Sequence, residues 1–284
     1  MIRKSLVALV ATLGIAAVVG ATSLLRESTV DGENYKVPSA SKVDLEAIAS
    51  AKVFFAHQSV GFNMLDAAPE VYADAGLAPP SVAQTTGAPT SAQIVHVKIG
   101  HNGDPLGKIE EFDAIMRAGM ADAVDVAVLK LCYVDIVVGT DVQVIFEAYR
   151  DTLDSLAADY PNTAFVAATA PLTTERGPLG KIKGIIGQGD NLGPEHNVIR
   201  EQFNALMRAE YDAPGELFDV AAIESTSEDG ERMGGMYDGK LYFAMSKDYA
   251  SDPGHLNPEG AAIVTSAFLA VLADALAPPT AATA

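Results

Sequence analysis

A serine follows the first predicted strand of the chain, in the segment Ala56-His57-Gln58-Ser59-Val60-Gly61. A strand-to-helix turn of this kind projects the serine hydroxyl toward the edge of a sheet, near the positive end of the next helix. Backbone N–H groups at that place can stabilise an oxyanion. The turn is not a full Gly-x-Ser-x-Gly elbow, because His57 stands at the first glycine position. Two interpretations of Ser59 therefore stay open: a nucleophile, or a residue that only caps the helix.

The acid and the base that a serine nucleophile needs occur together near the end of the chain, in residues 251–258 (SDPGHLNP). A nucleophilic serine requires a base that takes its proton, and the base requires an acceptor that fixes its tautomer. Asp252 and His255 are three residues apart on one predicted loop before a helix. The pair can supply both functions, so the sequence predicts chemistry at a serine.

Alternating strands and helices must position these residues. Apolar, β-branched runs predict five strands, and periodic apolar positions predict the helices between them, with a last helix from Pro258 to Leu276. This alternation predicts a parallel sheet with helices on both faces. The predicted strands are 52–57, 93–99, 125–132, 164–172 and 217–223, and the other predicted helices are 62–75, 108–119, 142–156 and 196–211.

Ligands bind such sheets beyond the carboxyl ends of the strands. The loops 58–61, 101–107 and 133–140 follow the first three predicted strands, so they are expected side by side on one rim. The loop 251–257 precedes the last helix and can reach the same rim. Ser59, Asp252 and His255 are therefore expected to meet there.

The combination resembles the SGNH (GDSL-like) hydrolases. Ser59, the Asn102-Gly103 pair and Asp252-x-x-His255 carry the resemblance, together with the segments FFAHQSVGFNML, LKLCYVDI, LFDVAAIEST and GHLNPEG. These segments resemble a bacterial branch that lacks the literal Gly-Asp-Ser signature, over about residues 50–276. The resemblance implies a flavodoxin-like three-layer α/β/α sandwich, for which we expect a five-stranded parallel sheet.

The same resemblance implies ester hydrolysis through an acyl-serine, without a cofactor. Carried over by position, Ser59 is the nucleophile, His255 the general base and Asp252 the group that orients His255. The backbone N–H groups of Ser59 and Gly103 then donate to the oxyanion.

One departure from the family concerns the oxyanion. The family's third block is Gly-x-Asn-Asp, whose asparagine donates to the oxyanion, whereas residues 131–135 (LCYVD) contain no asparagine. The loss of one such donor costs ~10²–10³ in rate. Either Asn102 substitutes for it, which we expect, or the site is weak or differently tuned.

The other histidines and the single cysteine have several interpretations. His57 and His101 are expected to bind substrate, and for His57 a histidine at the rim that is hydrogen-bonded to backbone is an equal alternative. His96, His196 and Cys132 are expected to be structural, the cysteine as a buried small hydrophobe. A metal site is a weaker alternative, since its ligands come from separate loops without compact spacing; they would be His57, His101, Asp104 and Asp135.

The N-terminus predicts export. Arg3 and Lys4 precede an uncharged apolar stretch over residues 6–25, which is typical of a secretory signal peptide and also long enough for a membrane anchor. Both interpretations place the rest outside the cytoplasm. We expect a leader over 1–25, a polar spacer over 26–49, the catalytic domain over 50–276 and a disordered tail over 277–284. The glycine-rich stretch 177–193 is expected to be a loop over the site.

The expected protein is a secreted, periplasmic or membrane-anchored serine esterase that acts on a small-molecule or glycan ester, with an O-acetyl group on a glycan as first choice because of location. A net charge of −18 argues against nucleic acid and anionic membrane surfaces as partners. The alternatives are an acyltransferase of the same fold and a non-catalytic glycan-binding module.

Overall fold

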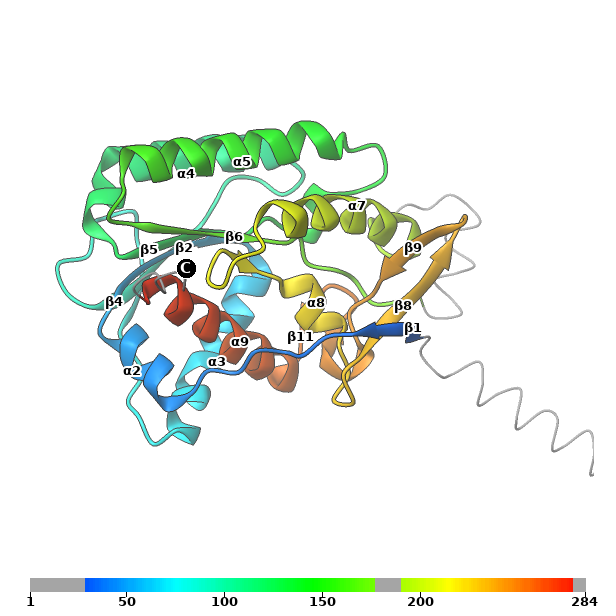
Figure 1. Ribbon diagram of the computed structural model, residues 1–284, viewed down its shortest axis with the longest axis horizontal. Coiled ribbons are helices and arrows are strands. Elements are labelled where there is room, and N and C mark those ends of the chain that lie inside the picture. Colours follow the sequence, from blue (N-terminus) through cyan, green and yellow to red (C-terminus); the bar gives the residue numbers. More distant parts are fainter. Residues whose placement is uncertain (1–28, 177–189, 278–284) are drawn as a thin grey trace, which may run out of the picture.

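The structure is a computed structural model, and it describes residues 29–176 and 190–277 (Figure 1). The predicted leader, most of the predicted loop 177–193 and nearly all of the predicted tail lie outside these residues. The longer helices are α2 (Lys42–Ala49), α3 (Ser59–Asp74), α4 (Pro105–Ile115), α5 (Val142–Asp159), α7 (Pro194–Glu210), α8 (Val220–Ser225) and α9 (Pro258–Leu276).

Six parallel strands form the central sheet, in the order β3-β4-β2-β5-β6-β7. All five predicted strand regions contribute to it, and the sixth, β3, is a three-residue edge strand that the sequence analysis missed. Without β3, the order is that of flavodoxin-like sheets. The strands are β2 (Lys52–His57), β3 (Val82–Gln84), β4 (Gln93–Lys98), β5 (Val126–Leu129), β6 (Ala164–Ala168) and β7 (Leu217–Phe218).

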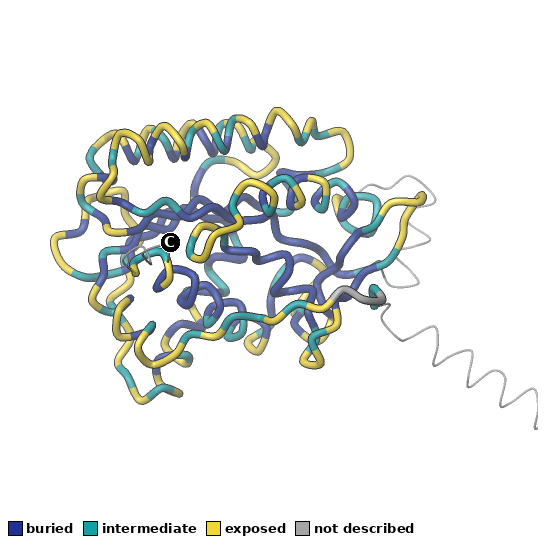
Figure 2. Tube along the Cα trace, in the orientation of Figure 1, coloured by how far each residue is buried: buried dark blue, intermediate teal, exposed yellow. Residues whose placement is uncertain are grey.

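Helices cover both faces of the sheet, as predicted (Figure 1). Successive side chains of a strand point to opposite faces, and β2 divides its residues between two cores in this way. Val53 and Phe55 pack with residues of α2, α3 and α9, whereas Phe54 and Ala56 pack with residues of α4, α5 and α7. Figure 2 shows the strands buried between helices whose outer faces are exposed. The fold is therefore a three-layer α/β/α sandwich.

The last helix, α9, has the predicted bounds and is part of the core. Among the described residues it is the one helix long and apolar enough to cross a membrane. Its side chains, however, pack in the core against α2 and α3, and Val264, Phe268 and Leu272 are at most 2% exposed. The apolar composition of α9 is accounted for by this packing.

Residues 29–49 are structured, which corrects the predicted spacer. Strand β1 (Thr29–Asn34) pairs with β8 (Glu231–Tyr237), and β8 pairs with β9 (Lys240–Phe243), so that a second, antiparallel sheet forms at one end of the molecule (Figure 1). Helix α2 begins with a capping box between Ser41 and Asp44 and buries Leu45 and Ile48 against the core. The domain therefore begins well before residue 50.

The fifth predicted strand is shorter than expected. β7 ends at Phe218, because the side chain of Asp219 accepts a hydrogen bond from Ala222 N–H and caps α8. The apolar residues Val220 and Ile223 then enter the core from a helix. Two short strands, β10 (Ala250–Asp252) and β11 (His255–Leu256), pair with each other and shape the loop before α9.

Candidate active site

Ser59 is the first residue of α3, at the carboxyl end of β2. The helix begins three residues earlier than predicted, after Gln58, whose backbone is extended and whose side chain makes no cap. Ser59 is therefore not the cap of this helix. Its hydroxyl is partly exposed and lies 2.9 Å from His255 Nε2. Its backbone N–H belongs to the first turn, where helical N–H groups have no partner within the helix.

Asp252 holds the other side of the His255 ring. His255 Nδ1 lies 2.9 Å from each oxygen of the Asp252 carboxylate. A carboxylate only accepts hydrogen bonds, so Nδ1 carries the proton and Nε2 is left to accept from the Ser59 hydroxyl. Partial burial alone would raise the pKa of Asp252, but the Gly254 N–H and His255 lower it below its usual value. The carboxylate thus stays charged beside the imidazole.

Tyr133, which the sequence analysis did not single out, packs against this pair. Its ring lies edge-to-face with the His255 ring, with centroids 6.3 Å apart. A Cβ on Gly254 would lie 2.6 Å from the Tyr133 ring, so only glycine fits at this place. The buried Arg200 guanidinium lies 5.4 Å from the Tyr133 ring and donates to the Tyr133 carbonyl oxygen over 2.9 Å. Arg200 thus fixes the position of Tyr133, and the Tyr133 ring in turn limits where His255 can lie.

The loop after β4 corrects one predicted oxyanion donor. The backbone N–H of Gly103 donates to Asp135 Oδ1 over 2.8 Å, so it is already used within the protein. Asp135 is buried, and its other oxygen accepts from Lys108 Nζ over 2.6 Å and from Cys132 N–H over 2.7 Å. In this structure Gly103 is part of a buried ion-pair network.

The side chain of Asn102 remains a candidate donor in the same loop. Its Oδ1 accepts from Lys108 Nζ over 3.2 Å, which orients the amide. Because the oxygen is engaged, the NH2 group is the end available to a ligand, and within the described part of the chain it makes no hydrogen bond. His101 precedes it and is exposed at the rim.

His57 is not at the rim, which corrects its predicted role in substrate binding. It is fully buried, and its Nδ1 donates to the Gln58 carbonyl oxygen over 2.7 Å. Its Nε2 lies 2.9 Å from His96 Nδ1, so His96 donates to it. Burial lowers the pKa of His57 to about 3 and also lowers that of His96. The backbone hydrogen bond of the alternative interpretation is present, but that interpretation also placed His57 at the rim, where it does not lie.

Gln58 connects the serine turn to the loop after β4. Its side chain is buried, and its Nε2 donates to the carbonyl oxygens of Ile99 and Gly100, the latter over 3.2 Å. These residues immediately precede the His101–Gly103 segment. Gln58 thereby fixes the position of Ser59 relative to Asn102. The sequence analysis did not identify this role of Gln58, because a glutamine before a serine is not a recognisable motif.

The residues of the alternative metal site have separate partners. Asp104 caps α4 by accepting from Gly107 N–H over 3.0 Å, Asp135 pairs with Lys108, and His57 pairs with His96. Within residues 29–176 and 190–277, no group of three or more metal-ligating side chains is assembled. Cys132 is buried, as predicted.

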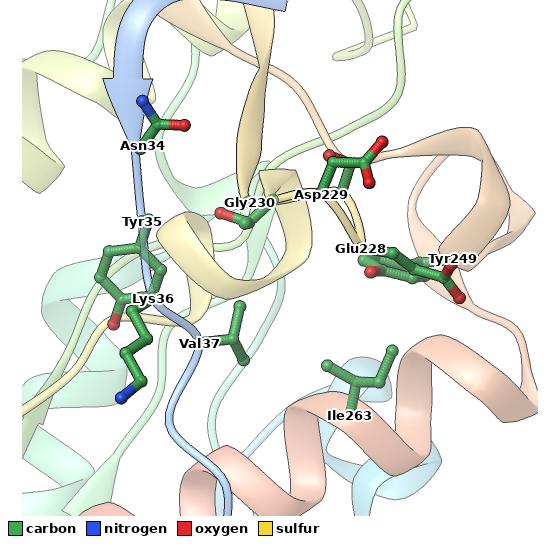
Figure 3. Close-up of a pocket in the computed structure, with 11 residues that line it drawn as sticks. Asn34, Tyr35, Lys36, Val37, Glu228, Asp229, Gly230, Tyr249 and Ile263 are labelled. Carbon is green, nitrogen blue, oxygen red and sulfur yellow. The ribbon is translucent and has the colours of Figure 1, made fainter.

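A cavity of about 720 Å³ lies apart from this site, between the segment after β1 and the start of α9 (Figure 3). Tyr35, Val37, Tyr249 and Ile263 line it, and Ser59, Asp252 and His255 do not. The reactive side chains are therefore in the open rim of the sheet and not in this cavity.

Comparisons with known proteins give likenesses at low identity. No protein-family model matches the chain, and no curated protein matches it. A structure described as a platelet activating factor from Streptococcus pneumonia is 16% identical with a TM-score of 0.47, and covers 90% of this chain and 99% of its own. A lipopolysaccharide acetyltransferase periplasmic domain from Salmonella ser. Paratyphi A is 15% identical with a TM-score of 0.41, covering 76% and 80%. A structure described as a GDSL-like lipase from Parabacteroides merdae is 12% identical with a TM-score of 0.43, covering 84% and 99%. At these scores the likenesses carry no argument about activity.

Proposed function

We propose that this protein is a serine hydrolase of the SGNH type that cleaves an ester through an acyl-serine at Ser59. The observation that carries the proposal is the hydrogen-bonded chain Ser59–His255–Asp252, whose members come from opposite ends of the domain, 196 residues apart between the serine and the histidine. Nucleophile, base and orienting carboxylate stand in the order that acyl transfer requires.

The proposed reaction has two halves. His255 Nε2 takes the hydroxyl proton while Ser59 Oγ bonds to the ester carbonyl carbon, and His255 then gives the proton to the leaving alcohol oxygen as the ester C–O bond breaks. Water then attacks the acyl carbon while His255 takes its proton, the bond between that carbon and Ser59 Oγ breaks, and His255 returns the proton to Oγ as the acid leaves. Asp252 stabilises the imidazolium in both halves.

The oxyanion would be bound by the Ser59 N–H at the start of α3 and by the Asn102 amide. The first donor is favoured by the positive end of the helix, and the second is oriented by Lys108. Gly103 is not included, because Asp135 occupies its N–H.

Hydrolysis is favoured over transfer to another alcohol by the exposure of the site. The side chains of His255 and Asp252 are 33% and 54% exposed, so water has access to the histidine that would activate it. An acyltransferase needs to exclude competing water from its intermediate. We further propose that the enzyme acts outside the cytoplasm, on the basis of the apolar stretch 6–25, and that an O-acetylated glycan is its substrate.

Labelling with a fluorophosphonate, located by intact mass and peptide mapping, tests the proposal. We expect a single adduct on Ser59 that is absent from Ser59→Ala and strongly reduced in His255→Ala. Circular dichroism of each variant controls for folding. A folded wild-type protein that takes up no label would contradict the proposal and favour the non-catalytic glycan-binding module.

A further inference from the structure

A groove of about 260 Å³ runs along α3 and the start of α9. Asn63, Asp66 and Glu70 line it from α3, and Leu256 and Asn257 line it from the segment that enters α9. These residues belong to the two elements that also carry Ser59 and His255. Among the residues that the structure describes, no lysine, arginine or histidine lines the groove.

The groove lies along the same two chain segments as the candidate active site, although Ser59 and His255 do not themselves line it. Side chains four and seven residues apart lie on one face of a helix, so Asn63 and Asp66 share the face of Ser59. With a rise of about 1.5 Å per residue, Asn63 lies ~6 Å and Glu70 ~16 Å along the helix axis from Ser59. On the opposite wall, Leu256 directly follows His255. A substrate held at Ser59 can therefore extend into this groove.

The chemistry of the lining favours a group that donates hydrogen bonds. Asn63 Oδ1 is buried and has no hydrogen-bond partner among the described residues. A buried acceptor without a donor is unfavourable. Asn63 is only half-buried and lines the groove, so rotation of its side chain would bring Oδ1 to the groove surface, where a hydroxyl of a ligand would satisfy it. Asp66 and Glu70 are exposed carboxylates one turn apart, with no ion-pair partner among the described residues. An acyl chain laid over them would desolvate charge without compensation, and an anionic group would be repelled.

We propose that this groove binds the hydroxyl-bearing alcohol part of the ester, with Asn63 accepting a hydrogen bond from one hydroxyl. Asp66 and Glu70 discriminate against alcohols that carry a negative charge. The groove thereby sets specificity for neutral sugar esters over uronate esters and long-chain acyl esters. This inference rests on the proposed function of Ser59.

The test compares kcat/KM for three esters: p-nitrophenyl acetate, an O-acetylated methyl hexoside and an O-acetylated methyl hexuronate. In Asn63→Ala, the ratio of kcat/KM for the hexoside over p-nitrophenyl acetate is expected to fall about tenfold, mainly through KM, since one hydrogen bond to the sugar is lost. Asn162→Ala is the matched control. Asn162 is exposed in the turn before β6, at the amino ends of the strands and so at the opposite end from Ser59, and should leave the ratio as in wild type.

The charge variant Asp66→Asn/Glu70→Gln tests discrimination. We expect kcat/KM for the hexuronate relative to the hexoside to rise about threefold to tenfold at low salt. Glu147→Gln/Asp154→Asn removes the same two charges from the exposed side of α5, on the other face of the sheet, and should not change this preference.

The outcomes separate this inference from the proposed function. If Ser59 is labelled and p-nitrophenyl acetate is cleaved, but the variants keep the wild-type ratios or the hexoside is not cleaved, the groove proposal is overturned and the hydrolase stands. If no ester is cleaved and Ser59 takes no label, the proposed function fails, and this inference fails with it.

Discussion

The backbone N–H of Gly103 donates a hydrogen bond to the carboxylate of Asp135 over 2.8 Å. This contact ties the loop after β4 to the segment after β5, beside Ser59. The same carboxylate accepts from Lys108 Nζ, and both side chains are fully buried. The loop that carries Asn102 is thus fixed by a buried ion pair. A catalytic loop held in this way needs little reorganisation during the reaction.

Asp135→Asn is expected to destabilise the protein. The substitution leaves the buried Lys108 ammonium without its counter-charge, and removal of one partner of a buried pair costs about 3–5 kcal/mol. The free energy of unfolding in urea measures the effect. Asp113→Asn removes one of the two carboxylate partners of the exposed Arg117 and serves as the control, for which we expect a much smaller loss. Equal losses in the two variants would show that the buried pair contributes little.

The predicted elements agreed best with the structure where a local sequence pattern determines the element. The strand 52–57 and the helix Pro258–Leu276 have the predicted bounds, because a short apolar run and a proline at the first helical position after Asn257 are local signals. The hairpin β8–β9 was missed although the two residues between its strands, Asp238-Gly239, are a local turn signal. The strand β1 was missed because its partner, β8, lies about 200 residues away in sequence. Such partners cannot be read from a local window.

In the candidate site, too, local signals identified some residues, and residues that depend on long-range contacts were missed. Ser59, Asp252 and His255 were selected from their types and order, and the structure brings them together. The burial of His57 was not anticipated, although His57 lies two residues after Phe55 and therefore on the same face of β2, the face that packs against α3. The roles of Gln58 and Tyr133 depend on contacts with distant loops, for which the sequence carries no spacing signal.

Acid pH is expected to destabilise the fold through His57. Burial lowers its pKa in the folded protein to about 3, below the ordinary value of 6.5. Between these values the unfolded chain binds a proton that the folded chain does not, so stability is full above pH 6.5 and falls as the pH falls. The slope is at most about 1.4 kcal/mol per pH unit, or about 2 kcal/mol between pH 6.5 and 5.

His57→Gln separates this effect from that of other groups. Glutamine can still hydrogen-bond but does not titrate, so we expect the variant to be less stable at neutral pH and to lose less stability on acidification. Urea unfolding at about pH 7.5 and about pH 5 measures both differences. If wild type and variant lose the same amount on acidification, His57 does not supply the acid sensitivity.

Gly254→Ala is expected to lower activity by displacing the histidine. The added Cβ would lie 2.6 Å from the Tyr133 ring, so either the ring or the 252–255 loop must shift. A shift of about 1 Å at the general base can cost about 10²-fold in kcat. The kcat for p-nitrophenyl acetate and the urea midpoint are measured together, because a purely structural effect would change only the midpoint.

A second variant, Gly254→Ala/Tyr133→Leu, tests whether the clash with the Tyr133 ring causes the loss of kcat. Leucine removes the ring atoms that the new Cβ would meet, so the double variant should recover part of the kcat lost in Gly254→Ala. Tyr133→Leu alone is the reference that closes the cycle. Additive losses in kcat would mean that the glycine is needed for another reason than the Tyr133 ring.

Asn102→Asp is expected to reduce kcat by ~10²–10³ with little change in folding. The aspartate keeps an oxygen that accepts from Lys108, so the loop stays anchored, but the NH2 donor proposed for the oxyanion is lost and a negative charge stands in its place. Asn102→Ser offers a weaker donor and should retain more activity than the aspartate. Burst kinetics with p-nitrophenyl acetate measure acylation directly. Since an oxyanion donor acts in the transition state, KM should hardly change. If the variant instead raised KM and left kcat unchanged, Asn102 would be a residue that binds substrate. The Ser59 N–H would then need another partner in the oxyanion hole.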